Sequence, residues 1–231
     1  MAAAGALARG VSREKPRTDD IGPQVVASQV VQTDLKALPA PTSAAAASPI
    51  GAFAAYALAQ AALPEGTARD SVVIDPTSVM AGPRRLPCAA QPPAVVLDLD
   101  PATGTFDPND APTPAPGLID ALGKLRAAGL TVFWKSALPV ARADAVYTVL
   151  RAVGLDPDRT DRLLLVRGGD DTKEARLVDA ARDWCFVAAA GDRRGDFLEA
   201  LDYLRNPADP IATTVEPLIG NGWFVTPTPI D

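Results

Sequence analysis

The chain of 231 residues contains no histidine. This absence excludes serine–histidine triads, phosphohistidine chemistry and nearly all histidine-ligated metal sites, so any metal site must be rich in oxygen ligands, which suits Mg²⁺. Neither of the two cysteines, Cys88 and Cys185, is followed six residues later by an arginine, which excludes the signature loop of cysteine phosphatases. A Walker loop and a Gly-x-Gly-x-x-Gly motif are also absent from the sequence.

The chain has little positive charge and no long apolar run. Its formal net charge of −6 does not indicate a nucleic-acid or anionic-membrane surface. No apolar stretch reaches transmembrane length, and the first ten residues make a poor signal peptide. We therefore expect either a cytoplasmic protein or an exported one whose leader is missing from this sequence. The sequence leaves the oligomeric state open.

Three regions differ in composition. Residues 1–48 are rich in Ala, Pro, Ser and Thr and are predicted to form a mostly disordered arm, with a short helix near 25–35. Residues 49–64 are alanine-rich, begin after Ser48 and end at a proline, which predicts a helix. Residues 65–231 are predicted to form the main domain, with a short edge strand at 71–74.

From Ala94 onward, predicted strands alternate with predicted helices. The strands are expected at 94–98, 130–134, 162–166, 185–189 and 223–225, and the helices at 118–128, 141–153, 172–182 and about 191–204. Such alternation is typical of a parallel sheet covered on both faces. The sequence therefore predicts an α/β fold, a three-layer sandwich with a central parallel sheet.

Chemically useful side chains follow the predicted strands. Asp98 and Asp100 come at the end of the first strand, Lys135 and Ser136 follow the second, Lys173 comes after the third, and Asp192 and Asp196 follow the fourth. The carboxyl ends of parallel strands lie on one edge of a sheet, where ligands of open α/β folds bind. We therefore expect these side chains to converge there.

These four motifs, in this order, resemble those of the haloacid dehalogenase (HAD) superfamily of phosphohydrolases. From Asp70 onward the chain looks like the class B and class C acid phosphatases, the lipoprotein e(P4)-like branch. The supporting stretches are Asp70-Ser-Val-Val, Pro87-Cys, Pro93-Ala-Val-Val-Leu-Asp-Leu-Asp, Gly191-Asp-Arg-Arg-Gly-Asp-Phe and Pro217-Leu-Ile-Gly-Asn-Gly-Trp-Phe. The resemblance implies a HAD-like, Rossmannoid sandwich with a minimal cap, acting as a Mg²⁺-dependent phosphomonoester hydrolase on a small phosphomonoester.

The resemblance also implies a role for each matching residue. Asp98 would be the nucleophile that forms an aspartyl-phosphate, and Asp100 the general acid and then the base. Ser136 would hydrogen-bond a phosphoryl oxygen, and Lys173 would offset negative charge. Mg²⁺ would be held by Asp98, by Asp100 through its main-chain carbonyl, and by Asp192. Asp196 would be a metal ligand through water or would orient the other ligands.

Each of these residues also has an ordinary structural interpretation. Aspartates at strand ends are often caps or turn residues, Lys173 suits an exposed first helical turn, and Asp196 suits a helix N-terminus. Pro101 and Ala102 depart from the Asp-x-Asp-x-Thr form of the first motif. These departures motivate an alternative function, a catalytically weak or inactive HAD-like binding module. A phospho-accepting receiver domain fits less well, because its lysine comes last in the order.

The two cysteines lie near the expected amino ends of neighbouring strands in the HAD strand order. Cys88 precedes the first strand by six residues, and Cys185 begins the fourth. A Cys88–Cys185 disulfide would imply an oxidising compartment such as the periplasm. Two buried free thiols are the alternative.

Overall fold

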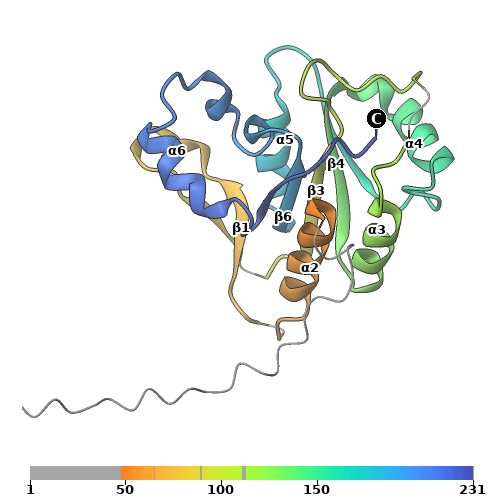
Figure 1. Cartoon of the computed structure of the whole chain (residues 1–231), viewed down its shortest axis with the longest axis horizontal. Helices are drawn as coiled ribbons and strands as arrows, with labels where there is room; N and C mark the ends of the chain where they lie inside the picture. Colours follow the sequence, from red (N-terminus) through yellow and green to blue (C-terminus); the bar gives the residue numbers. More distant parts are fainter. Residues whose placement is uncertain (1–47, 65, 89, 111–112, 231) are drawn as a thin grey trace, which may run out of the picture. The chain divides into compact units, whose positions relative to one another are not determined.

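The computed structural model describes residues 48–230, apart from 65, 89, 111 and 112. The predicted arm, except for Ser48, and its short helix near 25–35 lie outside these residues. The structure contains a central parallel sheet with helices on both faces (Figure 1), which confirms the predicted α/β three-layer sandwich.

Five parallel strands form the central sheet in the order β5-β4-β3-β6-β7. Their bounds are β3 Pro93–Asp98, β4 Thr131–Pro139, β5 Arg162–Val166, β6 Cys185–Gly191 and β7 Trp223–Val225. The apolar run that predicted the first strand is buried along its whole length in the middle of the sheet. All five strands end on the same edge, so their carboxyl ends bring distant segments of the chain together.

Four helices and one turn of helix cover the sheet. One face carries α2 Pro49–Ala61, α3 Leu118–Ala127 and α4 Ala143–Ala152, and the other carries α5 Lys173–Ala180 and α6 Pro210–Val215. Ser48 caps α2 by accepting a hydrogen bond from the N–H of Gly51 at 3.0 Å. In the described part of the chain, no helix is both long and apolar enough to cross a bilayer.

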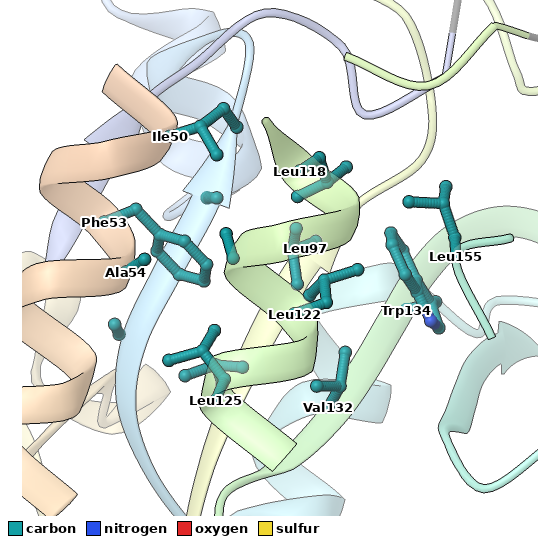
Figure 2. Close-up of a cluster of buried hydrophobic side chains, with 14 of the residues drawn as sticks. Ile50, Phe53, Ala54, Leu97, Leu118, Leu122, Leu125, Val132, Trp134 and Leu155 are labelled. Atoms are coloured by element: carbon teal, nitrogen blue, oxygen red, sulfur yellow. The ribbon is translucent and has the colours of Figure 1, made fainter. Parts of the chain in front are cut away.

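The helix predicted at 49–64 contributes to the main core. Figure 2 shows Phe53 on α2 beside Leu118, Leu122 and Leu125 on α3, with Trp134 of β4 further along the same layer. Phe53, Leu122 and Trp134 are completely buried. Although the boundary at residue 65 stays a prediction, α2 packs into the same core as the residues that follow it.

The strand predicted at 71–74 does not extend the central sheet. It is part of β1 Arg69–Ile74, which pairs with β2 Arg85–Cys88 in a separate antiparallel sheet. A disulfide between Cys88 and Cys185 joins this small sheet to the first residue of β6, with a Cα–Cα distance of 5.3 Å. The predicted disulfide is therefore present in the structure, and the alternative of two free thiols is wrong.

The helix predicted at about 191–204 is replaced by two short 3₁₀ turns, η3 Arg194–Asp196 and η4 Glu199–Tyr203. Main-chain donors in this segment bond to carboxylates instead of to the carbonyls four residues back: Asp196 Oδ2 accepts from the N–H groups of Asp192 and Arg193, and Glu174 accepts from that of Glu199. The remaining 3₁₀ turns are η1 Pro76–Ala81, η2 Val140–Arg142 and η5 Glu216–Leu218.

Candidate active site

Asp98 lies at the centre of a charged cluster at the carboxyl ends of the strands. It is the last residue of β3 and pairs in register with Lys135 on β4, so both side chains lie on the same face of the sheet. The Nζ atom of Lys173, at the start of α5, lies 3.0 and 2.8 Å from the two oxygens of Asp98. Lys135 Nζ lies 3.2 Å from Asp98 Oδ2. One buried carboxylate therefore contacts two ammonium groups.

The pKa of Asp98 reflects two opposing influences. Burial raises the pKa of this carboxyl above its ordinary value, while the positive charges of Lys135 and Lys173 act in the other direction. Only 1% of Asp98 is exposed. The two lysines and the main-chain N–H of Asp100, 2.9 Å from Asp98 Oδ1, therefore offset only part of the cost of burying this carboxylate.

Asp100 is held by donors from three segments. Its Oδ1 accepts from the Ser136 hydroxyl at 2.5 Å and from the N–H of Phe106 at 3.1 Å, and its Oδ2 accepts from the N–H of Ala137 at 2.7 Å. Lys173 Nζ lies 3.1 Å from the same Oδ2. Burial acts to raise the pKa of Asp100, but Lys173 and these hydrogen bonds together bring it below its ordinary value. Asp100 is thus arranged as an ionised proton acceptor.

Ser136 is completely buried, and its hydroxyl is occupied within the protein. It donates to Asp100 and accepts from the N–H of Leu138 at 3.0 Å. In the structure it orients Asp100, and its role as a ligand of a phosphoryl oxygen stays a prediction.

Asp192 and Asp196 come from the turn after β6. Asp196 is buried, and its Oδ2 caps the N–H groups of Asp192 and Arg193 at 3.0 and 3.1 Å. Asp192 Oδ2 accepts from the hydroxyl of Thr228 at 3.1 Å. Gly191 permits this tight turn, because a Cβ atom there would lie 2.6 Å from the Cβ of Asp196.

Two carboxylate oxygens in this turn suit a bound cation. Asp192 Oδ1 and Asp196 Oδ1 are buried and accept no hydrogen bond from the described residues, although Asp196 Oδ1 lies 3.4 Å from Arg193 Nε and 3.7 Å from Lys173 Nζ. Asp98, the other predicted carboxylate ligand, contacts ammonium groups through both oxygens. No group of three acidic or cysteine side chains that could hold a metal forms in the part of the chain that the structure describes. Asp192 and Asp196 therefore offer carboxylate oxygens that suit Mg²⁺, while both oxygens of Asp98 contact lysines and Asp196 Oδ1 also contacts Arg193 and Lys173.

A cleft of about 310 Å³ opens beside this cluster. Its lining includes Lys135, Lys173 and Asp196 from the cluster, together with Arg193 and the exposed ring of Tyr203. Arg193 pairs with Asp202 at 2.9 Å and with Asp196 Oδ1 at 3.4 Å. Three cationic side chains line this space together with five acidic ones, Asp171, Glu174, Asp196, Glu199 and Asp202, and its volume admits a small phosphorylated molecule.

The structure brings the predicted residues Asp98, Asp100, Ser136 and Lys173 into direct contact, and Asp196 lies 3.7 Å from Lys173. Asp192 is linked to this group because its main-chain N–H donates a hydrogen bond to Asp196 Oδ2. Lys135 was expected at this edge of the sheet without a chemical role of its own, and Thr228 was not singled out from the sequence. A signal for Lys135 was present, because it is a charged residue directly after the apolar run Leu130–Trp134.

No family model matches the chain, and no curated protein shows significant sequence similarity to it. Two solved structures have similar folds, and both are of the class C acid phosphatase from Bacillus anthracis. The first is 19% identical over 60% of this chain and 67% of the other, with a TM-score of 0.45. The second, with tungstate bound, is 18% identical over 60% and 68%, with a TM-score of 0.44.

Proposed function

We propose that this protein is a phosphoric monoester hydrolase that transfers the phosphoryl group of a small phosphomonoester first to Asp98 and then to water. The observation that carries the proposal is the shared contact of Lys173 with two carboxylates from one strand end, at 2.8 Å from Asp98 and 3.1 Å from Asp100. A nucleophile and a proton-transfer group beside one fixed positive charge are what a two-step phosphoryl transfer requires.

In the first step an oxygen of Asp98 bonds to phosphorus as the bond from phosphorus to the ester oxygen breaks. The departing oxygen takes a proton from Asp100, so this carboxyl must gain a proton before the step, although its surroundings favour the ionised form. In the second step Asp100 accepts a proton from water as the water oxygen bonds to phosphorus, and the Asp98–phosphorus bond breaks to release phosphate. Lys173 balances the negative charge that gathers on the phosphoryl oxygens.

Mg²⁺ belongs to the proposal as a cofactor. Asp192 and Asp196 would hold it through their Oδ1 atoms, which for Asp196 means replacing its contacts with Arg193 and Lys173, and Asp98 and the main-chain carbonyl of Asp100 would complete the predicted ligand set. The ion would add positive charge beside the phosphoryl group when bound.

The test of the proposal is hydrolysis of p-nitrophenyl phosphate by the full chain, with and without Mg²⁺, across a range of pH. Because Asp98 forms the covalent intermediate, we expect Asp98→Asn to lower kcat by at least about a thousandfold. Asp107→Asn, at an exposed loop residue, is the matched control and should retain normal turnover. Turnover that survives Asp98→Asn excludes Asp98 as the nucleophile.

One observation favours a second candidate function, a domain that binds phosphate without hydrolysing it. Asp98 is 1% exposed and does not line the cleft, and both of its oxygens already contact ammonium groups. Binding of inorganic phosphate without turnover of a broad panel of phosphoesters, in the presence of Mg²⁺, would favour this function over hydrolysis.

A further inference from the structure

Lys135 is an unusual residue for the position it occupies. It follows Phe133 and Trp134 in the central sheet and is 4% exposed. Of the three lysines in residues 48–230, Lys124 is exposed on α3, whereas Lys135 and Lys173 both contact Asp98. Burying an ammonium group is costly unless oxygen atoms replace its water. Lys135 can therefore be buried here only because oxygen atoms of the protein contact its ammonium group.

Those partners are a carboxylate and a carbonyl. Lys135 Nζ lies 3.2 Å from Asp98 Oδ2 and donates a hydrogen bond to the main-chain carbonyl of Asp196. Carboxylate and main-chain carbonyl oxygens are also the atoms that a hard divalent cation takes as ligands. The ammonium thus joins β3 to the turn after β6, the two segments that the predicted metal ion would connect.

Lys135 also lines the cleft in which we expect phosphate to bind. An ammonium group has three N–H donors, and the described residues provide two partner atoms, Asp98 Oδ2 and the Asp196 carbonyl. Because Lys135 lines the cleft, the remaining donor is available to an oxyanion bound there. Lys135, Lys173 and Arg193 bring three positive charges to a space that five acidic side chains also line, so the ammonium and guanidinium groups are its only donors of positive charge among the described lining residues.

We propose that Lys135 is a resident cation of the site, which binds phosphate directly and competes with a divalent metal ion at Asp98. The inference rests on the proposed function only in taking the cleft as the phosphate site. Its consequence is that the protein binds phosphate without a metal ion and has weak affinity for Mg²⁺. Removal of the ammonium should reverse both properties.

The experiment is isothermal titration calorimetry on the full chain, with inorganic phosphate and with Mg²⁺ as separate probes. The wild-type protein should bind phosphate with a Kd that differs by no more than about twofold between EDTA and excess Mg²⁺. Lys135→Met should weaken phosphate binding in EDTA by about tenfold or more, and Mg²⁺ should restore it. The same variant should bind Mg²⁺ at least about tenfold more tightly than the wild-type protein does.

Lys124→Met is the matched control, because it removes the same charge from an exposed position away from the cleft. It should bind both probes as the wild-type protein does. If Lys135→Met does not fold, Lys135→Gln replaces it, since glutamine keeps an N–H donor for the Asp196 carbonyl but carries no charge. If neither variant folds, phosphate binding by the wild-type protein in EDTA decides the question.

Two results would overturn the inference: a requirement for Mg²⁺ in phosphate binding by the wild-type protein, or equal Mg²⁺ affinity in the wild-type protein and the folded variant. These outcomes are distinguishable from a failure of the proposed function. A protein that hydrolyses phosphoesters but binds phosphate only with Mg²⁺ contradicts the role of Lys135 alone. A protein that binds phosphate in EDTA and never hydrolyses an ester contradicts hydrolysis alone.

Discussion

At the scale of single residues, the two motif-one aspartates have different surroundings. Asp98 has ammonium groups as its main partners, whereas Asp100 accepts from a hydroxyl and two main-chain N–H groups in addition to Lys173. The surroundings of Asp100 lower its pKa and fix its orientation. This difference suits a nucleophile beside a separate proton-transfer group.

Asp100→Asn should therefore separate the two chemical steps. The p-nitrophenolate leaving group needs little protonation, so the first step should proceed, whereas activation of water should be slowed because asparagine cannot accept the proton. We expect a burst of about one p-nitrophenolate per protein molecule, followed by turnover slowed about 10²- to 10³-fold. Stopped-flow absorbance measures both phases, and an alkyl phosphate, which needs the acid, should give no burst. Wild-type turnover in Asp100→Asn would contradict the role of Asp100.

Most of the candidate residues could be predicted because their order along the chain follows the order of strand ends. Asp98, Asp100 and Lys173 are examples, since each follows or ends an apolar run whose direction the α/β pattern determines. The place of Lys135 at this edge was expected in the same way, but its contacts could not be predicted. Its role depends on the main-chain carbonyl of Asp196, and side-chain patterns do not report where a carbonyl of a distant turn lies.

At the scale of elements, the turn after β6 depends on one glycine. A Cβ atom at Gly191 would lie 2.6 Å from the Cβ and Oδ2 atoms of Asp196, which is closer than real contacts allow. Asp196 is buried and its Oδ2 caps two N–H groups, so it has little freedom to move away. Asp196 can therefore occupy this position only because residue 191 has no side chain.

Gly191→Ala should destabilise the protein by about 2 kcal/mol through this overlap and should weaken phosphate binding. The matched control is Gly123→Ala on α3, where an added Cβ has no neighbour within 4 Å. Because alanine favours a helix, the control should be about 0.5–1 kcal/mol more stable than the wild-type protein. Urea unfolding followed by circular dichroism measures both changes. Equal stability of Gly191→Ala and the wild-type protein would contradict the tight approach.

The elements that the sequence predicts well are those whose hydrogen bonds are local or whose apolar pattern is continuous. The strand at 94–98 and the helix at 118–128 belong to this kind. The strand β2 was not predicted, since Arg85–Cys88 contains Pro87, which disfavours a strand interior. The segment 191–204 was predicted as a turn and a helix, but carboxylates accept hydrogen bonds from three of its N–H groups.

At the scale of the whole described region, the disulfide links two sheets across 97 residues of sequence. It joins β2 to the amino end of β6, while the charged cluster lies at the carboxyl ends of the strands. A cross-link over a long loop restricts the unfolded chain, which stabilises the folded state. The stabilising disulfide and the charged cluster therefore lie at opposite edges of the sheet.

Replacing both cysteines by alanine should lower the free energy of unfolding by about 3–5 kcal/mol. Phosphate binding at 25 °C should remain that of the wild-type protein, because the bond lies away from the cleft. Urea unfolding with and without a reductant measures the first effect, and reductant should have no effect on the double variant. Two reactive thiols in the denatured, unreduced wild-type protein would contradict the disulfide.

One edge of the central sheet ends in β7, a strand of three residues, Trp223–Val225. Its Trp223 ring is buried, and the indole N–H donates to the main-chain carbonyl of Val72 at 2.8 Å, which anchors the strand to the small antiparallel sheet. An edge this short offers few free main-chain groups for a strand from another molecule. The geometry of β7 thus gives this side of the protein a built-in resistance to self-association through strand addition.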